Sequence, residues 1–227
     1  MKVLVVDVGG THVKILATGQ KQSREFPSGP TLTAKQMVAG VKKLAVDWKY
    51  DAVSIGYPGL VIGNRPLAEP HNLGRGWMGY DFRAAFKRPV KVVNDAAMQA
   101  LGSYKGGKML FLGLGTGLGS ALVWQKTIMP LELGDLPYEG GLIEDVLGKP
   151  GLARLGKKMW EREVHFCVEH LKLAFIADYV MLGGGNAKLL SKLPAGAELG
   201  HNRNAFLGGV RMWETEPRSK RPKWTVL

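Results

Sequence analysis

The chain has 227 residues, of which 45% are hydrophobic and 22% charged, the composition of an ordinary water-soluble globular protein with a large core. Its single cysteine, Cys167, excludes a disulfide framework and a cysteine metal site. No apolar stretch is long enough to span a bilayer, and Met1 and Lys2 lead directly into an apolar run rather than a signal peptide. We therefore expect a cytoplasmic protein with no membrane partner.

The formal net charge of +12 at pH 7 favours polyanionic partners: nucleic acid, anionic lipid or phosphate-rich small molecules. Part of this charge lies in the segment 218–223, which is predicted to be a solvated, disordered end. Nucleic acid is not the expected partner, because the sequence lacks an aromatic RNA-binding signature, a zinc finger and a clear helix-turn-helix. Charge alone therefore indicates a polyanion without naming it.

The first predicted element is a strand, 3–8, that contains Asp7 and is followed by Gly9, Gly10 and Thr11. A second apolar run at 13–17 makes this a predicted β-hairpin with glycines at its tip, where backbone N–H groups can approach a ligand. Asp7 is then placed to hold Mg²⁺ through water, with Thr11 as a hydroxyl donor. The alternative is an ordinary hairpin turn in which Asp7 is only a turn acid.

The rest of the first half alternates strands and helices. We predict a helix over 33–48 with Thr33 as its N-cap, further helices over 80–86 and 96–101, and strands over 22–26, 51–57 and 90–93. Helices and strands in this order imply a mixed sheet with helices on its faces.

The second half repeats the theme. Strands are predicted over 108–114, 120–125, 127–133 and 179–182, and helices over 152–177, 186–193 and 204–213. Both halves open with a strand, a glycine turn and a strand, which suggests an internal duplication with a ligand cleft between two lobes. We expect an N-terminal lobe over 1–104 and a C-terminal lobe over 105–227, with the last helix able to pack back on the N-terminal lobe.

Four segments, taken in order, resemble the ROK sugar kinases of the actin-like ATPase superfamily. Asp7-Val-Gly-Gly-Thr-His-Val-Lys14 resembles their first phosphate motif, 93–97 their catalytic segment, 112–119 their second phosphate motif and 182–185 their adenosine motif. The short chain and the stretch 132–136 are most similar to the polyphosphate glucokinases. The resemblance implies a two-lobed, actin-like and ribonuclease H-like α/β fold, each lobe a mixed sheet flanked by helices. It also allows a homodimer, formed through the long helix after Leu152.

The resemblance implies a sugar kinase that transfers a phosphoryl group from ATP or inorganic polyphosphate to a glucose-like hexose, with Mg²⁺. Asp95 becomes the catalytic base that accepts the proton of the sugar hydroxyl, its alternative being the N-cap of the helix that follows. Asn94, Glu132 and, more weakly, Asn72 become sugar ligands. Asp135 stands where the family has histidine, which leaves the identity of the sugar open.

The donor phosphates are assigned to backbone amides and a few side chains of three glycine turns. The expected residues are Asp7, Gly9, Gly10, Thr11, Lys14, Gly115, Thr116, Gly117, Gly183, Gly184 and Gly185. Plain turns, and for Lys14 an exposed strand position, are the alternatives. Lys105, Lys108 and the basic end of the chain are expected to extend a polyphosphate track from the cleft. A non-catalytic sugar-binding regulator, and a kinase of another small-molecule alcohol, are the competing functions.

Overall fold

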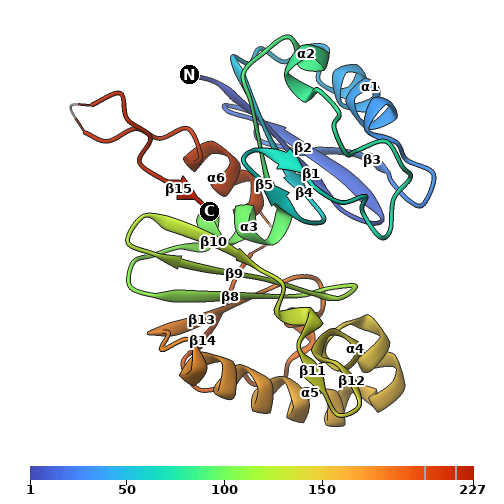
Figure 1. Ribbon diagram of the computed structural model, residues 1–227, viewed down its shortest axis with the longest axis vertical. Coiled ribbons are helices and arrows are strands. Elements are labelled where there is room, and N and C mark those ends of the chain that lie inside the picture. Colours follow the sequence, from blue (N-terminus) through green and yellow to red (C-terminus); the bar gives the residue numbers. More distant parts are fainter. Residues whose placement is uncertain (202, 218) are drawn as a thin grey trace.

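The computed structural model describes residues 1–201, 203–217 and 219–227, which form two lobes with a pair of helices between them (Figure 1). The N-terminal lobe is built on a mixed sheet in the order β3-β2-β1-β4-β7. β1 is antiparallel to β2 and parallel to β4, which is parallel to β7. These strands are β1 (Val3–Val8), β2 (His12–Ala17), β3 (Arg24–Pro27), β4 (Ala52–Tyr57) and β7 (Val90–Asn94). The hairpin β5 (Val61–Ile62) and β6 (Arg65–Pro66) and the helices α1 (Ala34–Leu44) and α2 (Phe82–Phe86) complete this lobe.

The C-terminal lobe repeats this strand order and adds one strand. Its sheet runs β14-β13-β8-β9-β10-β15, with β8 antiparallel to β9 and parallel to β13. These strands are β8 (Met109–Leu114), β9 (Leu118–Trp124), β10 (Thr127–Leu131), β13 (Tyr179–Gly183), β14 (Ala197–Leu199) and β15 (Thr225–Val226). Outside the sheet lie the strands β11 (Pro137–Tyr138) and β12 (Gly141–Leu142), the helices α4 (Ile143–Leu147) and α5 (Lys149–Ala174), and the 3-10 turns Leu133–Asp135 and Asn186–Leu189. The predicted fold class, a mixed sheet flanked by helices in each lobe, is confirmed.

Each sheet packs against one core on each of its two faces. Alternate residues of its central strands point to opposite faces and so enter different cores. In β1, Leu4 and Val6 face the outer core of the N-terminal lobe, whereas Val5 faces the core shared between the lobes. In β8, Leu110 and Phe111 divide in the same way. None of the helices in the described ranges has the length and apolarity needed to cross a bilayer.

The two helices between the lobes are α3 (Asp95–Ser103) and α6 (Asn204–Arg211), and they lie in contact along their length. Glycine makes this contact possible: a Cβ on Gly102 would come within 1.7 Å of the Asn204 carbonyl oxygen, and one on Gly208 within 1.8 Å of the Met98 carbonyl oxygen. α6 is also tied to β4, because the Ser54 hydroxyl donates to the Gly209 carbonyl at 2.6 Å. The crossing therefore sets the distance between the two sheets.

The start of the first helix is predicted correctly from its capping residue. Thr33 is the N-cap of α1, with a capping box in which Gln36 accepts from the Thr33 backbone N–H, although the helix ends earlier than predicted. The predicted helix over 186–193 is wrong beyond its first turn. There the Ser191 backbone N–H and hydroxyl both donate to Glu161 of α5, so a side chain of the long helix satisfies the backbone instead. α5 itself is broken at Gly156, which has a φ of 72°.

The predicted disorder of the segment 218–223 is wrong for its described residues, whereas residues 219–222 are exposed to solvent as predicted. Thr225 and Val226 pair in parallel with β10, and Thr215 forms a β-bridge with Pro222. Lys223 adds an ion pair of 2.8 Å with Glu214. Arg218, where the predicted end begins, lies outside the described residues. The open edge of β10 supplies hydrogen bonds to Thr225 and Leu227, whereas the backbone N–H of Lys223 donates to the Glu214 carbonyl.

The α3–α6 crossing yields a stability prediction. We expect Gly102→Ala to lower the free energy of unfolding by about 3 kcal/mol, because the new methyl group meets backbone atoms that cannot move aside. Chemical denaturation followed by circular dichroism measures the change. Gly185→Ala is the matched control, since a Cβ there has no atom within 4 Å. Equal losses in the two variants would contradict this role for the crossing.

Candidate active site

Strand register brings the predicted acidic residues to one edge of the N-terminal sheet. Asp7 of β1 lies opposite Gly56 of β4, and Gly56 lies opposite Val93 of β7. Asp95 follows β7 immediately as the first residue of α3. Since the carboxyl ends of parallel strands meet at the same edge, the two carboxylates come close together, the usual position of a ligand site in α/β folds.

Burial and mutual repulsion make these carboxyls weak acids. Burial raises the pKa of Asp95 to about 7, and the charges of Asp7 and Glu132 contribute to the increase. Burial likewise raises the pKa of Asp7 to about 6, opposed by the neighbouring charge of Lys14. Lys14 is half-buried and lies directly opposite Asp7 on β2, so it is not the exposed strand residue of the alternative interpretation.

The helix cap at this site is Asn94, not Asp95. The Asn94 side-chain oxygen accepts from the Ala97 N–H at 3.1 Å, and its amide group donates to the Gly59 carbonyl at 3.2 Å. Asp95 already has helical geometry, and among the described residues its side chain accepts a hydrogen bond from its neighbour Ala96 at 2.8 Å. The capping interpretation of Asp95 is therefore wrong, because the preceding asparagine fills that position. This leaves most of the Asp95 carboxylate without a structural task.

The first glycine turn closes the β1–β2 hairpin next to this edge. The Gly9 N–H donates to the His12 carbonyl at 3.0 Å, and the Ser28 hydroxyl donates to the Gly9 carbonyl at 2.6 Å. A Cβ on Gly10 would lie 3.4 Å from the Cβ of Asn72, which places Asn72 against this turn. Thr11 is exposed at the tip of the hairpin.

The second glycine turn joins β8 to β9, and β9 passes the start of α3 just after this turn. A Cβ on Gly119 would come within 2.9 Å of the Ala96 Cβ. The turn is narrow, with the Gly115 N–H donating to the Gly117 carbonyl at 3.1 Å, and the Lys149 N–H donates to the Gly115 carbonyl at 3.0 Å. Thr116 at the tip is exposed. This is the segment of the C-terminal lobe that approaches the catalytic candidate.

The third glycine segment abuts the second. Gly184 has a φ of 81°, and a Cβ there would come within 2.2 Å of the Leu114 carbonyl oxygen, so glycine is required for this approach. The amide group of Asn186 donates to the Gly115 carbonyl at 3.1 Å. Gly183 is buried at the end of β13, whereas Gly185 is exposed. The two donor-binding candidates of this lobe therefore form one continuous surface.

The acids that are predicted to bind the sugar lie in the C-terminal lobe. Glu132 comes immediately before the 3-10 turn that follows β10 and Asp135 is the last residue of that turn, and both remain accessible to solvent. The pKa of Glu132 is raised by burial and by the charges of Asp135 and Glu144, whereas His71 opposes the increase. His71 belongs to the N-terminal lobe, so this interaction joins the two lobes across the site.

Glu144 and His71 were not predicted from the sequence. A Cβ on Gly117 would come within 2.3 Å of the Glu144 carboxylate, which therefore lies between the second glycine turn and Glu132. Neither residue belongs to a glycine motif or has a diagnostic spacing; only the folding of α4 and the loop at 70–77 brings them in. The fold brings together the site residues that were predicted from the sequence, and their catalytic roles stay predictions.

Comparison with known proteins identifies a family for the first part of the chain. The model of the ROK family matches residues 3–130. The chain is 25% identical to the polyphosphate glucokinase of Mycobacterium tuberculosis strain H37Rv, over 82% of this chain and 78% of that protein. It is 31% identical to the bifunctional enzyme NanE/NanK of Brucella melitensis over 53% of this chain, and it spans only 26% of the length of that relative.

Solved structures show the same fold. The inorganic polyphosphate/ATP-glucomannokinase from Arthrobacter sp. strain KM matches 92% of this chain and 96% of its own, with a TM-score of 0.79 and 21% identity. A ROK family glucokinase from Streptomyces griseus, solved with glucose and AMPPNP, matches 92% and 98%, with a TM-score of 0.72 and 16% identity. The predicted actin-like architecture is confirmed by these likenesses.

The weak acids predict that the fold loses stability as the pH rises. In the folded chain the pKa values of Asp7 and Asp95 lie at about 6 and about 7, against an ordinary 3.8, so folding retains protons that the unfolded chain releases. This stabilisation is fully present below the ordinary pKa and is lost as the pH rises through the folded pKa values. Asp95→Asn should therefore melt above the wild type, by a margin that grows from about pH 4 to about pH 8. Thermal unfolding across that range measures it; a margin independent of pH would contradict the prediction.

Proposed function

This chain belongs to the ROK family, and we propose that it is a sugar kinase that transfers a phosphoryl group to a hydroxyl group of a hexose. The observation that carries the proposal is the position of Asp95. Its carboxylate stands at the first turn of α3, beside the second glycine turn and near Asp7, with its pKa raised to about 7. Phosphoryl transfer requires positioning and charge stabilisation, which this arrangement is built to supply.

Asp95 acts as the base. A carboxylate with a pKa near neutrality accepts the proton of an attacking hydroxyl more readily than an ordinary aspartate does, and it still ionises at physiological pH. Asn94 holds the start of α3 and so fixes where Asp95 points. One of its two amide hydrogens is used by Gly59 among the described residues, which leaves the other for a sugar hydroxyl.

Glu132, Asp135 and Glu144 accept hydrogen bonds from sugar hydroxyls on the opposite side, with Asn72 contributing from the N-terminal lobe. Ionised carboxylates accept but do not donate, so the site suits a ligand rich in hydroxyl groups. We propose a glucose-like hexose, in keeping with the named glucokinase and glucomannokinase relatives. Asp135, in place of the histidine implied by the family resemblance, is the residue at which another hexose would be selected.

The donor is ATP or inorganic polyphosphate, the two donors named together for the Arthrobacter relative. Its phosphates are held by the backbone of the turns 9–11 and 115–117, with Thr11, Thr116 and Lys14 as side-chain donors, and Gly183, Gly184 and Gly185 lie under the rest of the donor. Asp7 would hold Mg²⁺ through water, and the ion would neutralise charge on the phosphates. The fit is supported by the repulsion between Asp7 and Asp95, which a cation would relieve.

Asp95→Asn tests the base directly. We expect kcat to fall by roughly 10²–10⁴-fold, because the amide cannot accept the proton, while the affinity for the sugar changes little. A panel of hexoses with ATP and polyphosphate, assayed with Mg²⁺, measures turnover, and calorimetry measures sugar binding. Asp81→Asn is the matched control, since Asp81 caps α2 and asparagine caps equally well. Saturable sugar binding by the wild type without turnover from either donor would contradict the kinase and favour a sugar-binding regulator.

The raised pKa of Asp95 gives the reaction a pH dependence. Because the base must be ionised, kcat/KM should rise about tenfold per pH unit below a midpoint near the Asp95 pKa of about 7 and level off above it. Asp7 titrates at about 6 within the same site, so the lower limb steepens there. Steady-state rates across the pH range measure the profile, and a midpoint near the ordinary pKa of 3.8 would rule out Asp95 as the titrating base.

A further inference from the structure

A second hollow lies at the other end of β7 from Asp95. We call it the tail groove: it has a volume of about 1020 Å³ and is walled by the β5–β6 hairpin, the start of α2, the residues 89–92, and the chain from Met212 onward. Val92 is the last residue of β7 that lines the groove and Asp95 lies three residues beyond it, so the groove and Asp95 are separated by about 10 Å of extended chain. The groove is therefore distinct from the proposed catalytic edge.

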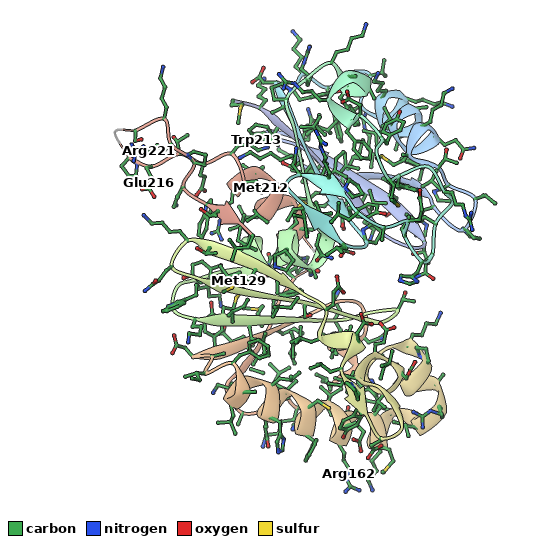
Figure 2. The ribbon with its side chains drawn as sticks, in the orientation of Figure 1. Met129, Arg162, Met212, Trp213, Glu216 and Arg221 are labelled. Carbon is green, nitrogen blue, oxygen red and sulfur yellow. The ribbon has the colours of Figure 1, made fainter. Side chains whose placement is uncertain are left out.

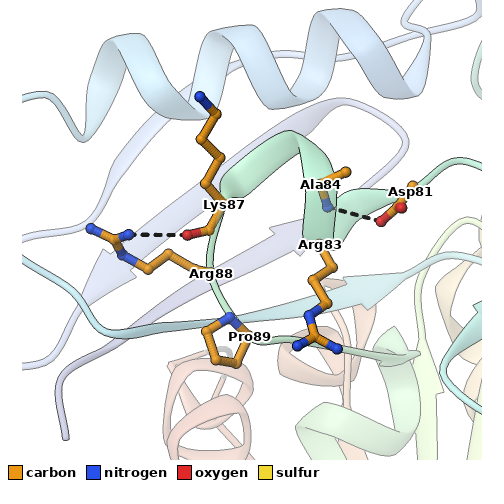
Figure 3. A pocket seen from close by; sticks show the side chains of 6 residues that line it. All are labelled: Asp81, Arg83, Ala84, Lys87, Arg88 and Pro89. Atoms are coloured by element: carbon orange, nitrogen blue, oxygen red, sulfur yellow. Dashed lines mark hydrogen bonds between the residues drawn. The ribbon is translucent and has the colours of Figure 1, made fainter.

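Basic side chains line this groove and continue beyond it. Arg65, Arg83 and Lys91 line the tail groove itself. Arg83 also lines a shallower neighbouring hollow of about 450 Å³, together with Arg88. Figure 3 shows Arg83 and Arg88 on either side of Pro89, with Lys87 extending away from both. The cations therefore form a row that runs through two joined hollows.

The row has no matching row of acids. Across residues 1–201, 203–217 and 219–227, the ion pairs involve none of the cations of the groove. The one carboxylate side chain among the described lining residues is Asp81, which accepts from the Ala84 N–H at 2.9 Å and so caps α2. Burial lowers the pKa of Lys91, since its ammonium group is partly withdrawn from water. The Lys91 ammonium group also donates to the Met212 carbonyl at 2.6 Å, so a bound anion would chiefly supply partners for Arg65 and Arg83.

Each of the two tryptophans of the groove has a lysine ammonium group over one face of its ring. The Lys91 ammonium lies 4.7 Å from the Trp213 ring centre, and the Trp213 N–H donates to the Ser54 hydroxyl at 2.8 Å. Trp224 has Lys223 at 5.2 Å from its ring centre. Figure 2 places Trp213 between the tail and the N-terminal lobe. Bases would need free aromatic faces on which to stack, so these contacts favour a ligand recognised by its oxyanions alone.

We propose that the tail groove binds a linear chain of phosphate groups, inorganic polyphosphate, through Arg65, Arg83 and Lys91. Guanidinium groups match phosphate oxygens with two parallel hydrogen bonds, and the row continues to Arg88, farther than a single phosphate group reaches. The charge distribution supports a chain here rather than along the expected track, because Lys105 is paired with Glu198 at 2.5 Å and Lys108 lies over Trp124. Holding a chain needs no turnover, so this site goes beyond the proposed kinase activity.

Binding of long-chain polyphosphate to the full chain carrying Asp95→Asn, without sugar, tests the proposal. Trp213 and Trp224 line the groove, so tryptophan fluorescence reports occupancy and calorimetry supplies the Kd. Arg65→Gln combined with Arg83→Gln should raise the Kd roughly tenfold and lower the slope of log Kd against log salt by about 1 to 2. Both side chains are exposed, so the fold should persist, which thermal unfolding verifies.

The matched control removes two positive charges elsewhere. Lys158→Gln combined with Arg162→Gln changes exposed residues of α5, and Figure 2 shows Arg162 at the far end of the C-terminal lobe. This variant should keep the Kd within about twofold, because screening limits long-range attraction. Equal weakening of both double variants, no binding at all, equally tight binding of orthophosphate, or equal competition by a single-stranded oligonucleotide would each overturn the proposal. Failure of the kinase would instead appear as absent turnover with polyphosphate binding intact.

Discussion

The contact between α3 and α6 is the constraint on which the rest of the structure depends. Both helices lie in the core shared by the two sheets, and they approach so closely that Gly102 and Gly208 have no room for a Cβ. The same α3 begins with Asp95 and places Ala96 against Gly119 of the second glycine turn. One helix, α3, therefore positions Asp95, contacts the strand that follows the second glycine turn and sets the spacing of the lobes. A substitution that shifts α3 would displace all three.

The candidate active site is a place where the folded structure disfavours the charges of its acidic side chains. Burial raises the pKa values of Asp95, Asp7 and Glu132, and the charges of Asp7 and Glu132 raise that of Asp95 further. Nothing in the packing requires acids here, because Asn94 already caps α3. Strain of this kind is maintained where chemistry needs it, and a bound cation and a sugar with its hydroxyl groups would both relieve it.

Charge is divided between the two ends of β7. Acids gather beyond its carboxyl end, whereas Lys91 and arginines without an ion pair among the described residues line the groove at its amino end. The net charge of +12 is therefore not spread evenly, and the part of it in the tail groove lies away from the reacting groups. In the proposed function, this separation would let one surface attract a polyanion while the other holds the base.

The sequence by itself determined the local elements and the motifs: the glycine turns, the Thr33 cap and the order of strands and helices follow from residue preferences over a few positions. It did not determine the partners that fold only through distant contacts. Glu144 and His71 reach the site through α4 and a loop, the end of the chain is ordered by the open edge of β10, and the segment at 190–193 is held by Glu161. Tertiary structure decided these, because their hydrogen bonds and charges come from residues far away in the chain, which no local pattern encodes.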